Sequence, residues 1–161
     1  MAFKRTMTYE EALEKLETLC DAAERCESEL REKLYRWGIN SRDTERLLDD
    51  LHARHLYDDQ RFANAYVHDK LQFSRWGRRK IVVGLIQKRI DESIRREALD
   101  TIDESEYAAI AHALLKSKAR QIKEGNTYEG RTKLYRFGLM RGFESDVVAA
   151  AIRGGNLFEH D

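Results

Sequence analysis

A dense group of positive side chains lies between Arg75 and Arg96, where eight Lys and Arg residues stand against only Asp91 and Glu92. The group surrounds the start of a predicted helix that carries Ile81. Positive charge is unfavourable at a helix N-terminus, because the helix macrodipole is itself positive there. We therefore expect an anionic partner to neutralise the cluster, and removal of its charges to be neutral or slightly favourable to the stability of the fold. The alternative is a solvated helix face whose Lys and Arg stems cover apolar neighbours.

A second group of side chains, of types that ligate metals or catalyse reactions, comprises His52, His55, Asp58 and Asp59. Two His residues three positions apart can share a helix face, and such a set can ligate a metal. We favour a structural interpretation, in which an Asp caps the next helix and both His residues lie in a polar connection. The sequence also contains no Gly-rich phosphate loop of the Walker type and no nucleophile elbow. We therefore expect no catalytic residue, no metal, no cofactor and no enzymatic activity.

The elements that must position these residues form a repeat. Three apolar positions nine residues apart occur three times, with offsets of 51 and 53 residues between the copies. They are Leu30, Ile39 and Leu48, then Ile81, Ile90 and Leu99, then Leu134, Phe143 and Ile152. Self-similarity at this period marks an architecture in which each unit buries its apolar face against its neighbours. We therefore predict an elongated all-α tandem array of three three-helix repeats, a surface suited to binding a long partner.

The predicted repeats cover residues 1–54, 55–103 and 104–153, and a tail at 154–161 is expected to be frayed. The chain has no proline and no sustained period-two alternation, so all the expected elements are helices. Of about nine expected helices, the first three are 8–25, 28–37 and one capped by Asn40 or Ser41. The next three are one capped by Asp58 or Asp59 and two that carry Ile81 with Leu85 and Ile94 with Leu99. The last three are 107–123, one around Leu134 and Phe137, and 145–152. Each group resembles a helix-turn-helix module. Because no base-reading side chains are identified, we favour simple burial of aliphatic residues as the reason for this pattern.

The composition indicates a globular chain of 161 residues, with 42% hydrophobic residues, 36% charged residues and no net charge. No apolar run approaches the ~20 residues of a membrane span, and the N-terminus has no signal-peptide core. Cys20 and Cys26 are too few for a disulfide framework, and on one predicted helix they point about 120° apart, so we expect a cytoplasmic protein. Residues 1–66 carry a net charge of −4 and residues 67–161 one of +4. This distribution fits an acidic protein or a nucleoprotein partner at least as well as naked DNA.

Four segments occur in an order and spacing that are more specific than any one of them. They are AERCESELREKLYRWGI, HLYDDQRFANAYV, WGRRKIVVGLIQKRI and KLYRFGLMRGFESDVVAAAI. The most specific pieces are Tyr57-Asp58-Asp59 with Arg61-Phe62-Ala63, and Gly77 followed by Ile81 and Leu85. Over about residues 9–153 the chain thereby resembles the RecX family of bacterial regulatory proteins. The resemblance implies an array of helical repeats that binds RecA recombinase and its filaments on DNA.

Two positions depart from the family pattern. The family favours Gly-Ile at the turn between the second and third helices, where the middle copy has Arg89 and Ile90. A left-handed Arg costs roughly 1–2 kcal/mol, so we expect that turn to be built differently. Gly138 replaces the leucine of the other two copies, Leu34 and Leu85, which predicts either a looser or a more closely packed helix.

The resemblance implies a regulatory function. We expect a monomer, with no membrane partner and weak direct binding to DNA. It is expected to occupy the groove of the RecA–DNA filament and to inhibit the recombinase, ATPase and coprotease activities of RecA in DNA repair and the SOS response. The residues expected to contact the partner are Arg75, Arg78, Arg79, Lys80, Lys88 and Arg89, with Arg131, Lys133 and Arg136 as a second set. Two alternatives are a helix-turn-helix DNA-binding protein of another pathway and a helical scaffold for a different acidic partner.

Overall fold

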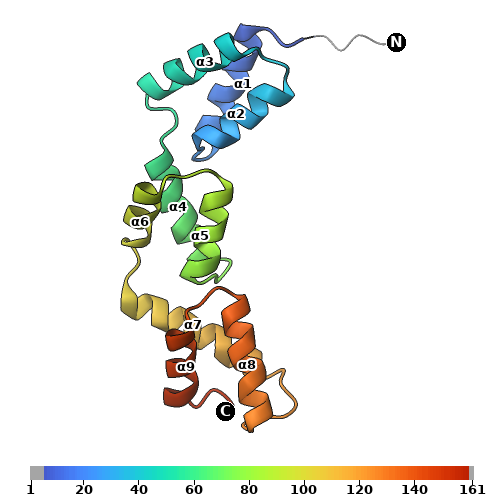
Figure 1. The fold of residues 1–161 in the computed structure, drawn as a ribbon, viewed down its shortest axis with the longest axis vertical. Coiled ribbons are helices and arrows are strands. Elements are labelled where there is room, and N and C mark those ends of the chain that lie inside the picture. The colour runs from blue at the N-terminus through green and yellow to red at the C-terminus, as the bar shows by residue number, and fades with distance from the viewer. Residues whose placement is uncertain (1–5, 160–161) are drawn as a thin grey trace, which may run out of the picture.

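A computed structural model describes residues 6–159 and contains, over that range, nine α-helices and no strand (Figure 1). The helices are α1 (Tyr9–Ala22), α2 (Glu27–Arg36), α3 (Ser41–Ala53), α4 (Asp59–Gln72), α5 (Arg78–Gln87), α6 (Glu92–Leu99), α7 (Glu104–Ala119), α8 (Tyr128–Met140) and α9 (Ser145–Gly154). The all-α prediction is confirmed. The groups α1–α3, α4–α6 and α7–α9 are here called repeats 1, 2 and 3. None of the described helices combines the length and apolar character needed to cross a bilayer.

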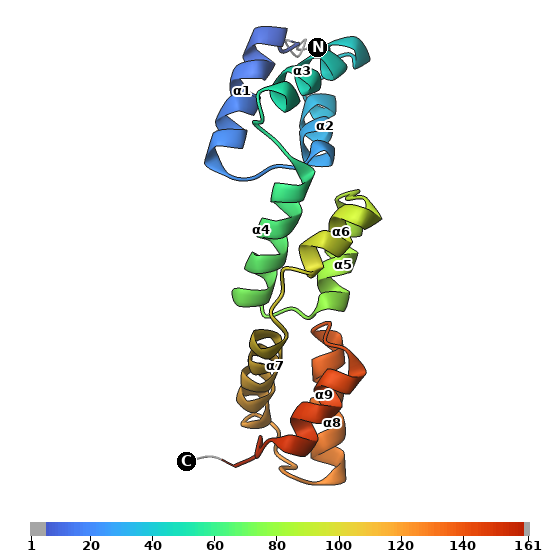
Figure 2. The same ribbon diagram turned by 90° about the vertical axis from the view of Figure 1, so that its left-hand side faces the viewer.

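The three repeats are stacked end to end into an elongated array (Figures 1 and 2). In Figure 1, α5 and α8 lie toward the right of the array and α6 and α9 toward the left. The turned view of Figure 2 brings α6 and α9 to the front. The corresponding helices of repeats 2 and 3 therefore face the same way, and α5 and α8, the second helices of these two repeats, lie on the same side of the array.

Local capping explains where several helices begin. The side chains of Thr8 and Asp58 accept hydrogen bonds from the backbone N–H three residues further on, at 3.1 and 2.9 Å. Asn40 caps α3 at 2.8 Å, and Asp103 accepts a bond from a backbone N–H in the first turn of α7. Each contact satisfies one of the N–H groups that a helix start leaves unpaired. Of the alternative caps predicted for α3 and α4, Asn40 and Asp58 are confirmed.

The turn between the second and third helices is the same in all three repeats. Its left-handed residue is Gly38, Arg89 or Gly142, with φ of 75°, 57° and 94°. The next residue, Ile39, Ile90 or Phe143, donates its backbone N–H to the carbonyl five residues earlier, at 3.0, 3.1 and 3.2 Å. The expectation of a different middle turn is therefore wrong. Burial of Ile90 in the core and its hydrogen bond hold Arg89 in the left-handed conformation despite its Cβ.

In repeat 3, a glycine allows two helices to approach closely. A Cβ at Gly138 would lie 2.8 Å from both γ-methyl carbons of Val148 on α9. Of the two outcomes expected for this position, the closely packed helix is confirmed. The leucines at the same position of the other repeats, Leu34 and Leu85, fill that space with their own buried side chains.

The buried core consists of two separate clusters. The first belongs to repeat 1 and contains Ala12, Leu16, Leu30, Leu34, Leu47, Leu48, Leu51 and Tyr57. The second runs continuously through repeats 2 and 3, from Phe62 on α4 to Leu157 near the C-terminus. Cys26, in the connection between α1 and α2, has a fully buried side chain that belongs to this second cluster. Repeat 1 thus packs on itself, whereas repeats 2 and 3 share one core.

Two predicted helix ends are wrong by about one turn. Helix α1 ends at Ala22 rather than at residue 25, and α7 ends at Ala119 rather than at residue 123. After α1 the chain turns so that Cys26 forms the N-cap of α2, and the Arg25 Nε donates to the carbonyl of Leu19 at 3.2 Å. The two cysteines therefore do not share a helix. Neither end carries a local helix breaker, so the sequence pattern could not locate them.

The segment after α9 is packed against the fold. Leu157 is 1% exposed and lies in the core that repeats 2 and 3 share. The expectation of a frayed tail is wrong for residues 154–159, and residues 160–161 lie outside the described range. One apolar side chain that returns to the core is sufficient to order such a short segment.

Candidate functional site

The predicted contact residues are concentrated around α5. Residues 70–90 include seven Lys or Arg residues and no Asp or Glu. The structure divides these cations, and the second set on α8, into two groups. Some are bound within the chain, and others are exposed without a partner among the described residues.

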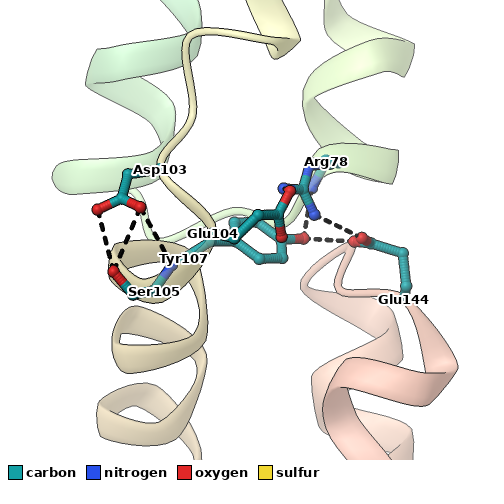
Figure 3. Close-up of polar contacts among 6 residues, drawn as sticks. All are labelled: Arg78, Asp103, Glu104, Ser105, Tyr107 and Glu144. Carbon is teal, nitrogen blue, oxygen red and sulfur yellow. Dashed lines mark hydrogen bonds and ion pairs between the residues drawn. The ribbon is translucent and has the colours of Figure 1, made fainter.

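Arg78 is held at the junction between repeats 2 and 3 (Figure 3). Its guanidinium donates to Glu144 at 2.8 Å and to Glu104, and lies 3.9 Å from the centre of the Tyr107 ring. Its side chain is only 20% exposed. The positive charge of Arg78 is therefore neutralised from within the chain. The expectation that a partner neutralises this charge is wrong for Arg78, and its contacts lead us to expect that removal of Arg78 lowers stability.

Tyr107 completes this junction. Its hydroxyl donates to Glu144 and accepts a hydrogen bond from the backbone N–H of Arg78 at 3.0 Å. Burial raises the pKa of Tyr107, and the hydrogen bond to Glu144 raises it further. Its ring packs 5.2 Å from the ring of Phe143, centre to centre. The group is a structural link between α5, α7 and the start of α9.

The backbone at the start of α5 is also bonded to repeat 3. The N–H of Gly77 donates to the carbonyl of Arg141 at 2.8 Å, and the N–H of Arg79 donates to that of Gly142 at 3.0 Å. A Cβ at Gly77 would lie 2.3 Å from the backbone of Gly142, so only glycine permits this approach. Free N–H groups at a helix start commonly bind anions. Here those groups are already used by the neighbouring repeat.

Lys88 joins repeat 2 to repeat 1. Its Nζ lies 3.1 Å from the Glu29 carboxylate, and its backbone carbonyl accepts a hydrogen bond from the Ser28 hydroxyl at 2.5 Å. We therefore regard Lys88 as a junction residue, although its side chain stays partly exposed.

Two predicted residues of α8 are paired locally. Lys133 forms an ion pair with Glu124, which raises the pKa of Lys133 and lowers that of Glu124. Arg131 donates to the Asn126 side chain at 2.9 Å. Both side chains are exposed, so a partner competes with weak surface contacts rather than with a buried network.

The remaining predicted cations are available to a partner. Four have exposed side chains for which the described part of the chain provides no hydrogen bond or ion pair: Arg75, Arg79, Arg89 and Arg136. Lys80 lies with its Nζ 4.7 Å from the centre of the Trp76 ring, and Lys70 lies at the same distance from that ring. Fewer residues are therefore available to a partner than the sequence predicted.

Exposed apolar residues beside these arginines were not predicted. Val83 and Ile86 on α5 are 54% and 51% exposed. A signal for them exists in residues 81–86, which read IVVGLI and are apolar on every side of the helix. A helix that packs on one side only normally has polar residues on its other side, so this pattern indicates apolar side chains that the fold does not bury.

The candidate metal residues have structural roles instead. Asp58 caps α4, and Asp59 accepts a hydrogen bond from the backbone N–H of Glu27 at 2.8 Å. The ring of His52 packs 5.5 Å from that of Tyr57. Among the described residues, no three His, Cys, Asp or Glu side chains gather as a metal site.

Comparison with protein families identifies two parts of the chain. Residues 58–99 match the second three-helix domain of RecX, and residues 104–152 match the third. The Regulatory protein RecX of Clostridium perfringens (strain SM101 / Type A) is 33% identical over 129 residues, which are 79% of this chain and 60% of that protein. The Regulatory protein RecX of Herminiimonas arsenicoxydans is 30% identical over 132 residues, 82% of this chain and 84% of its own length. The chain thus spans about three fifths of the length of the clostridial relative.

Solved structures share the fold. The crystal structure of RecX from Lactobacillus salivarius has a TM-score of 0.81 at 20% identity and covers 91% of this chain and 95% of its own. A second crystal structure of a regulatory protein RecX has a TM-score of 0.82 at 24% identity, over 91% of this chain and 73% of that one. These likenesses agree with the helical repeats described above. From its sequence relatives and the matched domains, the chain belongs to the RecX family of regulatory proteins.

Proposed function

We propose that this protein binds RecA recombinase and its filaments on DNA, and that it inhibits the recombinase, ATPase and coprotease activities of RecA. The observation that carries the proposal is membership of the RecX family. The resemblance to that family implies the regulation of RecA. The role is regulatory rather than enzymatic, and we place it in the cytoplasm, where RecA acts on DNA.

The geometry supports binding to an extended anionic assembly. The array presents Arg79 on α5 and Arg136 on α8 as exposed arginines without a partner in the described part of the chain. A surface of this kind gains attraction from many weak contacts to a long partner, each of them sensitive to salt. We propose that the array lies in the filament groove and obstructs strand exchange and filament growth.

The alternative of a helix-turn-helix DNA-binding protein is less well supported. In that motif the second helix of the pair enters the major groove. The corresponding helix of repeat 2 is α6, where Arg95 donates to the carbonyl of Ile90 at 2.6 Å and Arg96 pairs with Glu92 at 2.8 Å. The unpaired arginines lie on the other helix of the pair, so weak direct DNA binding accompanies the proposed function and does not replace it.

The test is a titration of RecA from the same organism. Single-strand-dependent ATP hydrolysis, strand exchange and repressor cleavage are measured as the protein is added from trace amounts to one per RecA. We expect all three activities to fall at amounts well below one per RecA. No change across the whole range would contradict the proposal and leave the scaffold alternative ahead.

A charge-matched pair of variants tests the surface itself. Arg79→Ala with Arg136→Ala removes two unpaired arginines from the side formed by the second helices. Arg42→Ala with Arg153→Ala removes two exposed arginines of α3 and α9 that also lack a partner in the described chain. We expect only the first pair to weaken inhibition, by about tenfold, and to flatten its salt dependence. Equal effects of both pairs would show that net charge alone decides binding.

A further inference from the structure

The outer side of α5 carries an exposed apolar ridge. Val83 and Ile86 follow Arg79 by four and seven positions, which places all three on one stripe of the helix. Both aliphatic side chains are about half exposed, whereas Ile81 and Leu85 on the opposite side are fully buried. Packing within repeat 2 uses only the second group. The ridge is therefore left without a function in the fold.

Two arginines near the ends of α5 have a strained backbone conformation. Arg75 and Arg89 have φ of 54° and 57°, in the left-handed region that glycine adopts without cost. At the position of Arg89, repeat 1 has Gly38 and repeat 3 has Gly142. Neither arginine side chain has a hydrogen bond or ion pair within the described chain. The fold gains nothing from an arginine at these turns, and strain of this kind is concentrated at functional sites.

The charge along the ridge is positive and changes sign at one end. Residues 71–90 contain no Asp or Glu. Beyond Arg89 a cleft of about 820 Å³ separates α5 from α2, whose residues Glu29 and Glu32 line the opposite wall. An acidic ligand on α5 is therefore attracted along the helix and repelled from repeat 1.

We propose that the α5 ridge of Val83 and Ile86, together with the flanking Arg75, Arg79 and Arg89, is the docking surface for an acidic protein segment that carries aliphatic side chains. The proposal rests on the proposed function, and the segment belongs to RecA within its filament. Two exposed aliphatic side chains favour protein over DNA, because the DNA backbone is contacted mainly through polar and charged groups. The ridge supplies the apolar contact, and the arginines select the charge of the partner.

Binding to RecA filaments on single-stranded DNA, assembled with a non-hydrolysable ATP analogue, tests the ridge. The double variant Val83→Ser and Ile86→Ser is expected to weaken binding by at least tenfold. Arg89→Gly is expected to weaken binding several-fold while it leaves the thermal midpoint unchanged or higher, because glycine relieves the left-handed strain. Loss of binding together with unchanged stability separates a contact role from a structural one.

The control is the double variant Arg42→Ala and Arg153→Ala, which removes two exposed side chains of α3 and α9, outside the side formed by the second helices. It is expected to bind like the parent, and circular dichroism verifies the helical content of every variant. If the parent binds the filament and the ridge variants bind equally well, the ridge proposal is wrong while the proposed function stands. If the ridge variants lose affinity for naked single-stranded DNA as much as for the filament, the ridge contacts DNA and the proposal is wrong. A parent that does not bind the filament overturns both.

Discussion

The two junctions between neighbouring repeats are built by different chemistry. Between repeats 2 and 3 the backbones themselves are bonded, at Gly77 with Arg141 and at Arg79 with Gly142. The apolar core continues across this junction without a break. Around it, Arg78 is held by two carboxylates and an aromatic ring (Figure 3).

Between repeats 1 and 2 the contacts are mostly polar and partly exposed. Asp59 accepts a hydrogen bond from the N–H of Glu27, and Lys88 pairs with Glu29. Arg61 lies 3.1 Å from the Glu24 carboxylate. The apolar contribution comes from Cys26, whose side chain is buried in the core of the next repeats, and from Tyr57 in the connection to α4, whose ring is buried in the core of repeat 1.

The difference indicates two units of unequal cooperativity. In repeat proteins, stability is approximately a sum of repeat and interface terms, so a strong interface joins two repeats into one folding unit. Repeats 2 and 3 meet that condition through a shared core. Repeat 1 has its own core and a polar interface, so it can open or tilt separately.

The largest expected effects come from charges placed in the two cores. Leu34 and Leu85 occupy equivalent positions and are both fully buried. An Asp at either position costs on the order of 4 kcal/mol or more, since it buries a charge without a partner. We expect Leu85→Asp to abolish hydrogen-exchange protection throughout repeats 2 and 3, and Leu34→Asp to abolish it in repeat 1 alone. Uniform loss in both variants would remove the distinction between the two units.

The next effect concerns the close approach at the tight junction. Gly77→Ala places a Cβ against the Gly142 backbone and is expected to cost about 3 kcal/mol in the free energy of unfolding, because backbone cannot move aside as a side chain can. Gly154→Ala is the control, since the added carbon would enter open space there. Urea denaturation measures both. A cost below about 1 kcal/mol for Gly77→Ala would mean that the junction adjusts easily.

A smaller effect compares one polar contact from each junction. Tyr107→Phe leaves the Arg78 N–H and the Glu144 carboxylate each without one partner, at an expected cost of about 1–2 kcal/mol. Lys88→Met removes a partly exposed ion pair with Glu29 and is expected to cost about 0–1 kcal/mol. Both are read from chemical denaturation. The reverse order would place the stronger junction between repeats 1 and 2.

The smallest effect is the pH dependence of the polar junction. Burial raises the pKa of Asp59 above its ordinary value of 3.8; the hydrogen bond from the Glu27 N–H opposes this increase, and the negative charges of Glu27, Asp58 and Asp91 add to it. The folded state therefore holds this proton more tightly than the unfolded chain does. The resulting stability is present below the ordinary pKa and is lost as pH rises through the raised one.

Asp59→Asn removes this titration and keeps a side-chain oxygen for the Glu27 N–H. We expect the thermal midpoint of the parent to fall relative to that of the variant as pH rises from 3.5 towards neutrality. The difference between the thermal midpoints of the two proteins cancels the contribution of the other carboxylates, which titrate in the same pH range in both. A difference that is constant with pH would show that Asp59 carries no penalty at the junction.

The sequence by itself determined the repeat and most helix starts. Both depend on residues that are close together along the chain. A cap such as Thr8 or Asp58 bonds to a backbone N–H three residues away, and burial on one side of a helix requires apolar residues at a period of 3.6. The nine-residue spacing followed from the same local geometry, since one turn separates two short helices in every copy.

Tertiary structure alone decided where the helices without a local stop signal end and which cations are free to bind a partner. Helix α1 ends at Ala22 because Cys26 packs in the core that repeats 2 and 3 share. No residue close to Ala22 in the sequence signals this helix end. Arg78 and Arg79 are neighbours of the same type in the sequence. Yet Arg78 reaches Glu104 and Glu144, 26 and 66 residues further along the chain, while the Arg79 side chain points to solvent. A charge is bound or available according to carboxylates that only folding brings near, so local pattern locates a basic cluster but does not identify the residues within it that are available to a partner.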